Sequence, residues 1–181
     1  MRKIITFGMI GFVSFIVSCT SESKYSDDDV AAIVRGDEIT VGDIRFLYEV
    51  KDKEIRDKLP GIIKGELAIQ EAKKLNIDVT EQVLEAIDLN GGYIPENDSS
   101  PGVKSTREFV DSQAKKLGMD PEEFYQEYIK ITTEKSAYIV GYIETIIGDS
   151  LEDIEEYSNK AYQLLDDLVE GNKDQIEILI D

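Results

Sequence analysis

Apolar residues recur at helical spacing along this chain, and strong cap signals interrupt the pattern. Over most of its length apolar residues recur three and four positions apart, as in helices that bury one face. Thr40 can cap the first such helix, and Asp120 followed by Pro121 is typical of the start of another. Asn76 and Gly118 suit the left-handed conformation that ends a helix. The sequence therefore predicts a mostly α-helical fold.

The cap signals divide the chain into several expected helices. Pro60 and Gly61 separate the first two, because proline removes a backbone donor and glycine is a poor helix former. Ser105 with Glu108 forms a capping-box pattern at a later helix start. The segment 90–102, NGGYIPENDSSPG, is the longest loop signal. The helices are expected at about residues 41–58 and 61–75, then over a shorter stretch that Thr80 caps and that includes Ile87, and then at about 105–117, 121–147 and from beyond Gly148 to about 169.

The N-terminal segment has the layout of an export signal. Arg2 and Lys3 precede an uncharged apolar run, Ile4 to Val17, which is shorter than the roughly 20 residues that a membrane span needs. Residues 16–19, Ile-Val-Ser-Cys, resemble the lipobox of bacterial lipoproteins. In that motif the cysteine is acylated on its thiol and becomes the new N-terminus after cleavage. The alternative is a buried or chance cysteine at the end of an ordinary signal.

Cys19 is the only cysteine of the chain, so it cannot form an intramolecular disulfide. We therefore expect Cys19 to be the lipid attachment site. The expected organisation is a lipoprotein signal peptide over 1–18, a lipidated acidic tether over 19–29 and one helical domain over 30–181. The lipid anchor implies the cell envelope, on the extracytoplasmic side of a membrane.

Charge and composition exclude several classes of function. Without residues 1–18 the chain has 18 basic and 38 acidic residues, a formal charge of −20, which repels nucleic acid and anionic lipid headgroups. The chain has no histidine, which excludes histidine-dependent catalysis and histidine or multi-cysteine metal sites. The acidic run Asp27–Asp29 lacks the alternation of a calcium-binding loop. We expect no cofactor, no metal and no enzymatic activity; the remaining enzymatic alternative is a hydrolase with paired carboxylates.

Two short runs are expected to be β-strands. Val30–Val34 is β-branched and ends at Arg35-Gly36-Asp37, and residues 175–180 have a similar apolar pattern. The tripeptide Arg35-Gly36-Asp37 is recognised by some adhesion receptors, but a tight turn is the plainer interpretation. Because an isolated strand is unstable and its buried backbone groups need partners, we expect the two strands to pair as a small ribbon that joins the chain ends.

Four segments follow the lipobox in a characteristic order: VAAIVRGDEITVGDI (30–44), LAIQEAKKLNIDVTEQV (67–83), DPEEFYQEYI (120–129) and AYQLLDDLVEGNKDQIEILID (161–181). Together they resemble the N-terminal chaperone region of the extracytoplasmic folding factors SurA and PrsA, which is related to the peptide-binding part of trigger factor. The likeness extends over about two thirds of the chain.

The chain departs from this family at one point. A parvulin-type prolyl isomerase domain usually lies between the long helix and the C-terminal segment, whereas here Ile147-Gly148-Asp149 joins them directly. No catalytic residue of the family can be carried over. The resemblance implies a membrane-tethered chaperone or holdase that binds unfolded or nascent exported proteins and has no isomerase activity. The alternative function is a lipoprotein scaffold or assembly subunit with one dedicated envelope protein as partner.

The expected long helix has a wider apolar stripe than one packing partner needs. Its tyrosines combine apolar area with a polar tip, which suits a contact surface for varied peptides. The alternative is that these tyrosines close the core. The candidate peptide-binding residues are Tyr125, Tyr128, Tyr138 and Tyr142.

Overall fold

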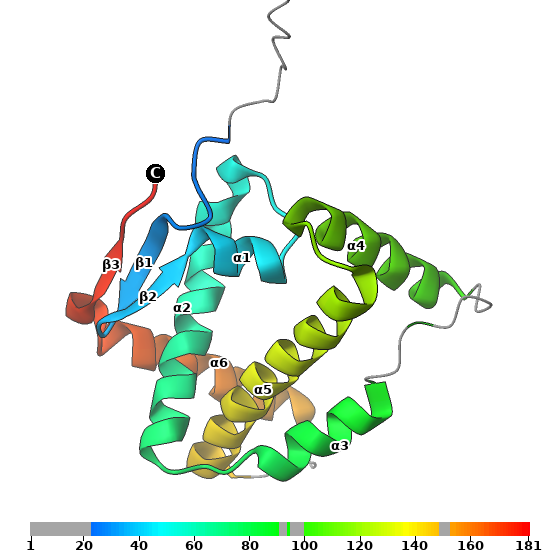
Figure 1. Cartoon of the computed structure of the whole chain (residues 1–181). Helices are drawn as coiled ribbons and strands as arrows, with labels where there is room; N and C mark the ends of the chain where they lie inside the picture. The colour runs from blue at the N-terminus through cyan, green and yellow to red at the C-terminus, as the bar shows by residue number, and fades with distance from the viewer. Residues whose placement is uncertain (1–22, 91–93, 95–99, 149–152) are drawn as a thin grey trace, which may run out of the picture.

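The computed structural model describes residues 23–90, 94, 100–148 and 153–181, and it is mostly helical with a small antiparallel sheet (Figure 1). The predicted signal peptide and Cys19 lie outside these residues. None of the described helices is long and apolar enough to span a membrane. The elements are β1 (Val30–Val34), β2 (Asp37–Thr40), α1 (Val41–Leu47), α2 (Asp52–Lys74), α3 (Thr80–Asn90), α4 (Pro101–Leu117), α5 (Pro121–Ile147), α6 (Ile154–Glu170), the 3₁₀ turn η1 (Lys173–Gln175) and β3 (Ile176–Ile178).

The predicted pairing of the chain ends is confirmed. β1 pairs antiparallel with β3, with Ala32 opposite Ile178 and Val34 opposite Ile176. The Leu179 N–H also donates to the Ala31 carbonyl at 2.9 Å. The sheet therefore joins the first and last elements of the described chain.

The sheet has one strand more than the sequence predicts, in the order β2-β1-β3. Arg35 and Gly36 both have positive φ, 53° and 91°, as expected for the two central residues of a tight hairpin turn. The tripeptide is thus the predicted turn, and it leads directly into β2. β2 was not predicted because only Ile39 in it is both apolar and buried. Its pairing with β1 depends on the turn rather than on its own composition.

The predicted helix break at Pro60-Gly61 is wrong. α1 ends earlier, at Leu47, and α2 runs without interruption through Pro60. The Lys51 N–H donates to the Glu54 carboxylate at 3.0 Å, which fixes the new start. A proline inside a helix costs about 3 kcal/mol. Burying one large apolar side chain stabilises by about 1.5–3 kcal/mol, and α2 buries several on both sides of the proline: Ile55, Leu59, Ile63 and Leu67.

Cap signals correctly predicted several of the other helix ends. Asn76 and Gly118 have φ of 56° and 68°, as predicted for residues that follow a helix. α5 begins at Pro121 with Asp120 as its N-cap. The capping box predicted at Ser105 is wrong, because α4 begins at Pro101, the first helical position that proline favours.

Three clusters of buried side chains hold the elements together. The largest lies between the sheet, α1 and α2, a second joins α2, α5 and α6, and a third joins α4 to α5. Phe46 of α1 extends into the third cluster, where its ring centroid lies 5.2 Å from that of Phe124. The buried Gln113 of α4 donates to the Arg45 carbonyl at 2.6 Å, so its amide is not left unsatisfied. α5 is the element against which α2, α3 and α4 all pack.

Residues 23–29, assigned to the tether, contact the domain instead of extending into solvent. The Val41 N–H donates to the Asp29 carbonyl at 2.8 Å, and the Gly42 N–H donates to the Asp27 carbonyl at 2.9 Å. The Tyr25 ring packs against the largest buried cluster. The part of the acidic segment from Ser23 onward is therefore docked on α1.

Candidate functional site

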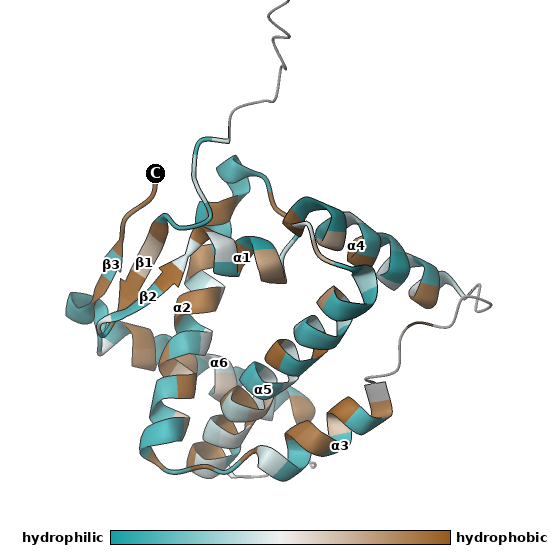
Figure 2. Ribbon diagram, in the orientation of Figure 1, coloured by the Kyte–Doolittle hydropathy of each residue, from teal (hydrophilic) through white to brown (hydrophobic). Residues whose placement is uncertain are grey.

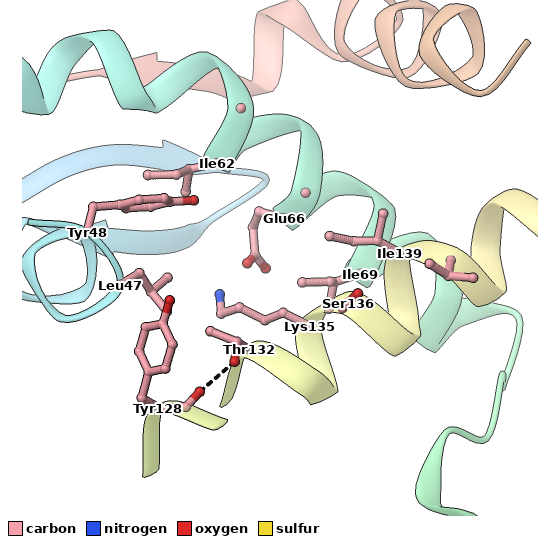
Figure 3. Close-up of a pocket in the computed structure, with 13 residues that line it drawn as sticks. Leu47, Tyr48, Ile62, Glu66, Ile69, Tyr128, Thr132, Lys135, Ser136 and Ile139 are labelled. Carbon is pink, nitrogen blue, oxygen red and sulfur yellow. Dashed lines mark hydrogen bonds between the residues drawn. The ribbon is translucent and has the colours of Figure 1, made fainter. Parts of the chain in front are cut away.

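A cleft of about 290 Å³ lies between α2 and α5 (Figure 3). Leu47 and Tyr48, at the end of α1, close one end of it. Its volume is near the lower end of the range for ligand pockets and suits a large apolar side chain. α2 contributes Gly61, Ile62, Gly65, Glu66 and Ile69, and α5 contributes Tyr128, Thr132, Lys135, Ser136, Ile139 and Val140.

Two glycines of α2 shape this cleft. A Cβ atom on Gly61 would have no heavy atom within 4 Å, so the absence of a side chain there leaves open space. A Cβ on Gly65 would lie 3.3 Å from Cδ1 of Ile139, so this glycine allows α2 and α5 to approach closely. The two glycines are four residues apart and therefore on one face of the helix. The cleft is therefore open at Gly61, whereas at Gly65 the two helices are in close contact.

Two charged side chains face each other at the middle of the cleft. Figure 3 shows the Lys135 side chain extended toward the Glu66 carboxylate. Within the described residues, no carboxylate lies within 4.0 Å of the Lys135 ammonium. Glu66 accepts one long hydrogen bond, 3.5 Å, from Nε2 of Gln70. The middle of the apolar cleft therefore presents a cationic donor group and an anionic acceptor group that a ligand can use.

Two smaller hollows share lining residues with the cleft. Glu66 and Lys135 line both of these hollows, of about 160 Å³ each. One leads toward Ile39 and Ile44, and the other leads toward Tyr138. The cleft and the two hollows therefore adjoin at Glu66 and Lys135.

A second hollow lies on the opposite side of the same α5 residues. It has a volume of about 450 Å³ between α3 and α5. Thr132, Ser136 and Val140 line both this hollow and the cleft, so they form a low ridge between them. Apolar residues recur along α3 (Figure 2), and Leu84 and Leu89 are 63% and 76% exposed. The apolar surface around α5 thus extends onto α3.

The four predicted tyrosines do not form one surface. Tyr142 is 7% exposed and belongs to the buried cluster between α2 and α5; burial raises its pKa. Tyr138 packs on the same cluster, with the Lys73 ammonium 5.5 Å from its ring centroid. Tyr128 lines the cleft, and burial raises its pKa as well. Tyr125 packs against the cluster between α4 and α5.

Of the four tyrosines predicted from the sequence, only Tyr128 lines the cleft. The residues at the middle of the cleft were not predicted. Gly61 was interpreted as part of a helix break, although a second glycine at Gly65 gave a signal of a small-residue face. Glu66 and Lys135 carry no sequence signal, because the chain has many carboxylates and lysines. Their proximity depends on how α2 and α5 pack.

Within the described ranges, no group of three or more histidine, cysteine, aspartate or glutamate residues is placed to hold a metal ion. Comparisons of the chain with protein-family models, with curated proteins and with solved structures find no match.

Proposed function

We propose that this chain is a lipid-anchored extracytoplasmic chaperone that holds extended apolar segments of exported proteins in the cleft between α2 and α5. The observation that carries the proposal is an open apolar cleft with an available donor and acceptor at its middle, Lys135 and Glu66. The lipobox at Cys19 and the family resemblance of the sequence support the same function.

The proposed mechanism is physical. An apolar side chain of the client enters at Gly61, and the client backbone donates to Glu66 and accepts from Lys135. Burial of one such side chain contributes about 1.5–3 kcal/mol, so a single contact is weak and exchanges readily. The high negative charge keeps the complex soluble and favours client segments with basic residues. The mechanism includes no prolyl isomerisation, because α6 follows α5 at the point where the family usually carries its isomerase domain.

The test uses the full-length lipoprotein in lipid nanodiscs and fluorescent peptides of unrelated sequence. Peptides with a leucine or phenylalanine between lysines should bind and should compete with one another. Matched peptides with aspartate in place of lysine should bind more weakly. The same protein should suppress aggregation of an unfolded exported protein without accelerating its proline-limited refolding. Failure to bind every peptide, together with no effect on aggregation, would refute the chaperone proposal.

The alternative is a scaffold subunit with one dedicated envelope partner. The exposed Leu84 and Leu89 on α3 favour it, because apolar side chains gathered on one helix suit a permanent interface. Purification of the lipoprotein from its native envelope separates the two functions. One stoichiometric partner would indicate a scaffold, whereas many substoichiometric exported proteins would indicate a chaperone.

A further inference from the structure

Arg45 joins the N-terminal segment to the first turn of α2. Nη2 of Arg45 donates to Ser23 Oγ at 2.6 Å, to the Tyr25 carbonyl at 3.0 Å and to Asp52 Oδ1 at 2.8 Å. Nη1 of the same residue pairs with Asp27. The Arg45 and Asp52 side chains are 21% and 26% exposed, so this ion pair is partly shielded from water. One cation thus holds three residues of the segment.

Backbone and ring contacts support this docking independently. A Cβ on Gly42 would lie 3.0 Å from the Asp27 carbonyl oxygen, a tighter contact than Cβ atoms usually make, so a side chain there would push the segment away from α1. The Tyr25 hydroxyl lies 3.2 Å from both the backbone nitrogen and the carbonyl oxygen of Asp181. The segment is therefore fixed to α1, to α2 and to the C-terminal end.

This docking shortens the link between Cys19 and the domain. Ser23 follows Cys19 by four residues, and an extended chain spans at most about 3.6 Å per residue, so the two are at most about 14 Å apart. If the segment were free up to Asp29, the link could reach about 36 Å. The difference decides whether the domain can turn freely above a membrane.

We propose that the surface around Ser23, the first turn of α2 and Asp181 faces the lipid surface in which the acyl chains of Cys19 are inserted. We call this surface the root face. Arg45 and Gly42 act as positioning residues for it. The inference rests on the proposed lipid anchor and is independent of the proposed chaperone activity.

The root face mixes cations with carboxylates such as Glu54 and Asp181, so it is less acidic than the chain as a whole. Lys51 and Lys53 are exposed on either side of Asp52, and Lys24 pairs with Asp181 at 3.8 Å. The Asp52 charge is paired with Arg45. Anionic headgroups therefore repel the root face less than they would repel a face of this chain that carries only carboxylates. α3 lies at the opposite end of the molecule from the N-terminal segment (Figure 1) and so points away from the membrane.

The test measures energy transfer from single positions on the full-length lipoprotein to acceptor-labelled lipid in vesicles of phosphatidylethanolamine and phosphatidylglycerol. Because Cys19 is acylated, an introduced cysteine is the one free thiol. The donor is attached at Ser26→Cys on the root face or at Glu85→Cys on α3, both exposed. We expect transfer to be several-fold stronger from position 26 than from position 85.

Two variants test the cause of this difference. A glycine-serine linker between Thr20 and Ser21, and separately Arg45→Met, should each make the two positions similar. The linker should leave the melting temperature unchanged. Equal transfer from both positions in the unmodified lipoprotein would overturn the inference while the anchor remains. Failure of the protein to float with vesicles would overturn both the anchor and the inference.

Discussion

At the scale of single residues, Gly61 has two opposing effects. A glycine inside an exposed helix costs about 0.5–1 kcal/mol relative to alanine, yet its missing side chain leaves the cleft open at that point. Stability alone would favour almost any other residue there. In the proposed function, this loss of stability is offset by the open space that Gly61 leaves for a ligand side chain.

Replacing Gly61 with leucine should therefore separate stability from binding. The added side chain occupies the cleft and improves helix propensity, so the free energy of unfolding should rise by about 0.5–1 kcal/mol. Peptide affinity should fall at least about tenfold, because the client loses the burial of one apolar side chain. Urea denaturation and peptide anisotropy measure the two effects.

Gly102→Leu is the matched control. Gly102 is also an exposed helical glycine with no atom within 4 Å of its Cβ position, but it lies in α4, away from the cleft. It should leave peptide affinity unchanged. Equal loss of affinity in both variants, or none in either, would contradict the assignment of the cleft as the binding site.

Asp52 should make stability depend on pH. Burial opposes ionisation, but hydrogen bonds from Arg45, Lys24 and Ser23 outweigh it and lower the pKa of Asp52 below its ordinary value, near 3.8. A lowered pKa in the folded state means stability that is fully present above the unfolded value and is lost as pH falls through the folded value. Asp52→Asn should therefore cost about 1–2 kcal/mol at pH 7 and progressively less below about pH 4.

Urea denaturation of both proteins at several pH values measures this difference. Asp57→Asn, an exposed carboxylate of the same helix, is the control and should change stability by less than about 0.5 kcal/mol throughout. A cost for Asp52→Asn that stays constant from pH 7 to pH 3 would show that the ionised carboxylate does not stabilise the docked segment.

At the scale of elements, helix ends with side-chain or left-handed caps could be predicted, and ends fixed by packing could not. The end of α2 at Asn76 was predictable, because asparagine tolerates the left-handed conformation that ends a helix. Asn76 has a φ of 56°, and the Ile77 N–H donates to the Ala72 carbonyl at 3.0 Å. The start of α2 has only a weak local signal, because its N-cap is Lys51, a residue type that rarely caps helices, and only the Glu54 carboxylate accepts from the Lys51 N–H. Its position follows from how the apolar face of α2 packs on the sheet, which also outweighs the effect of Pro60.

Pro60→Ala should consequently stabilise the protein. Alanine restores an N–H that can donate to the Arg56 carbonyl, while the loss of proline makes the unfolded chain more flexible. The net gain should be about 1–2 kcal/mol in urea denaturation. Pro121→Ala is the control, because proline at the first position of α5 is favourable and its replacement should bring no gain. A loss of stability in Pro60→Ala would mean that α2 depends on a bend at this residue.

At the scale of the whole molecule, the predicted pairing of the two ends was correct because it followed from a backbone requirement. β1 needs a partner, and few other runs in the chain could supply one. The cleft could not be predicted in the same way. It forms where α2 and α5 meet, and no local pattern relates Gly61 to Lys135 across this distance in the sequence.

The pairing makes the last residues essential for the whole fold. β3 covers one edge of β1, Ile180 is buried at 5% exposure, and the Ile180 carbonyl accepts a hydrogen bond of 2.6 Å from Nη1 of Arg56. Deleting residues 176–181 removes all of these contacts together with those of Asp181 to Tyr25. It also exposes the edge of β1, which can then pair with another chain.

We expect this deletion to lower the free energy of unfolding by at least about 3 kcal/mol, since it removes one buried side chain and several hydrogen bonds. The loss should appear as a lower urea midpoint with one cooperative transition, because β1 packs on the same buried cluster as α1 and α2. Leu179→Ser is the control: this residue is 53% exposed, so stability should change little. If the truncated chain unfolds at the same urea concentration as the intact one, the ends do not stabilise the domain by pairing.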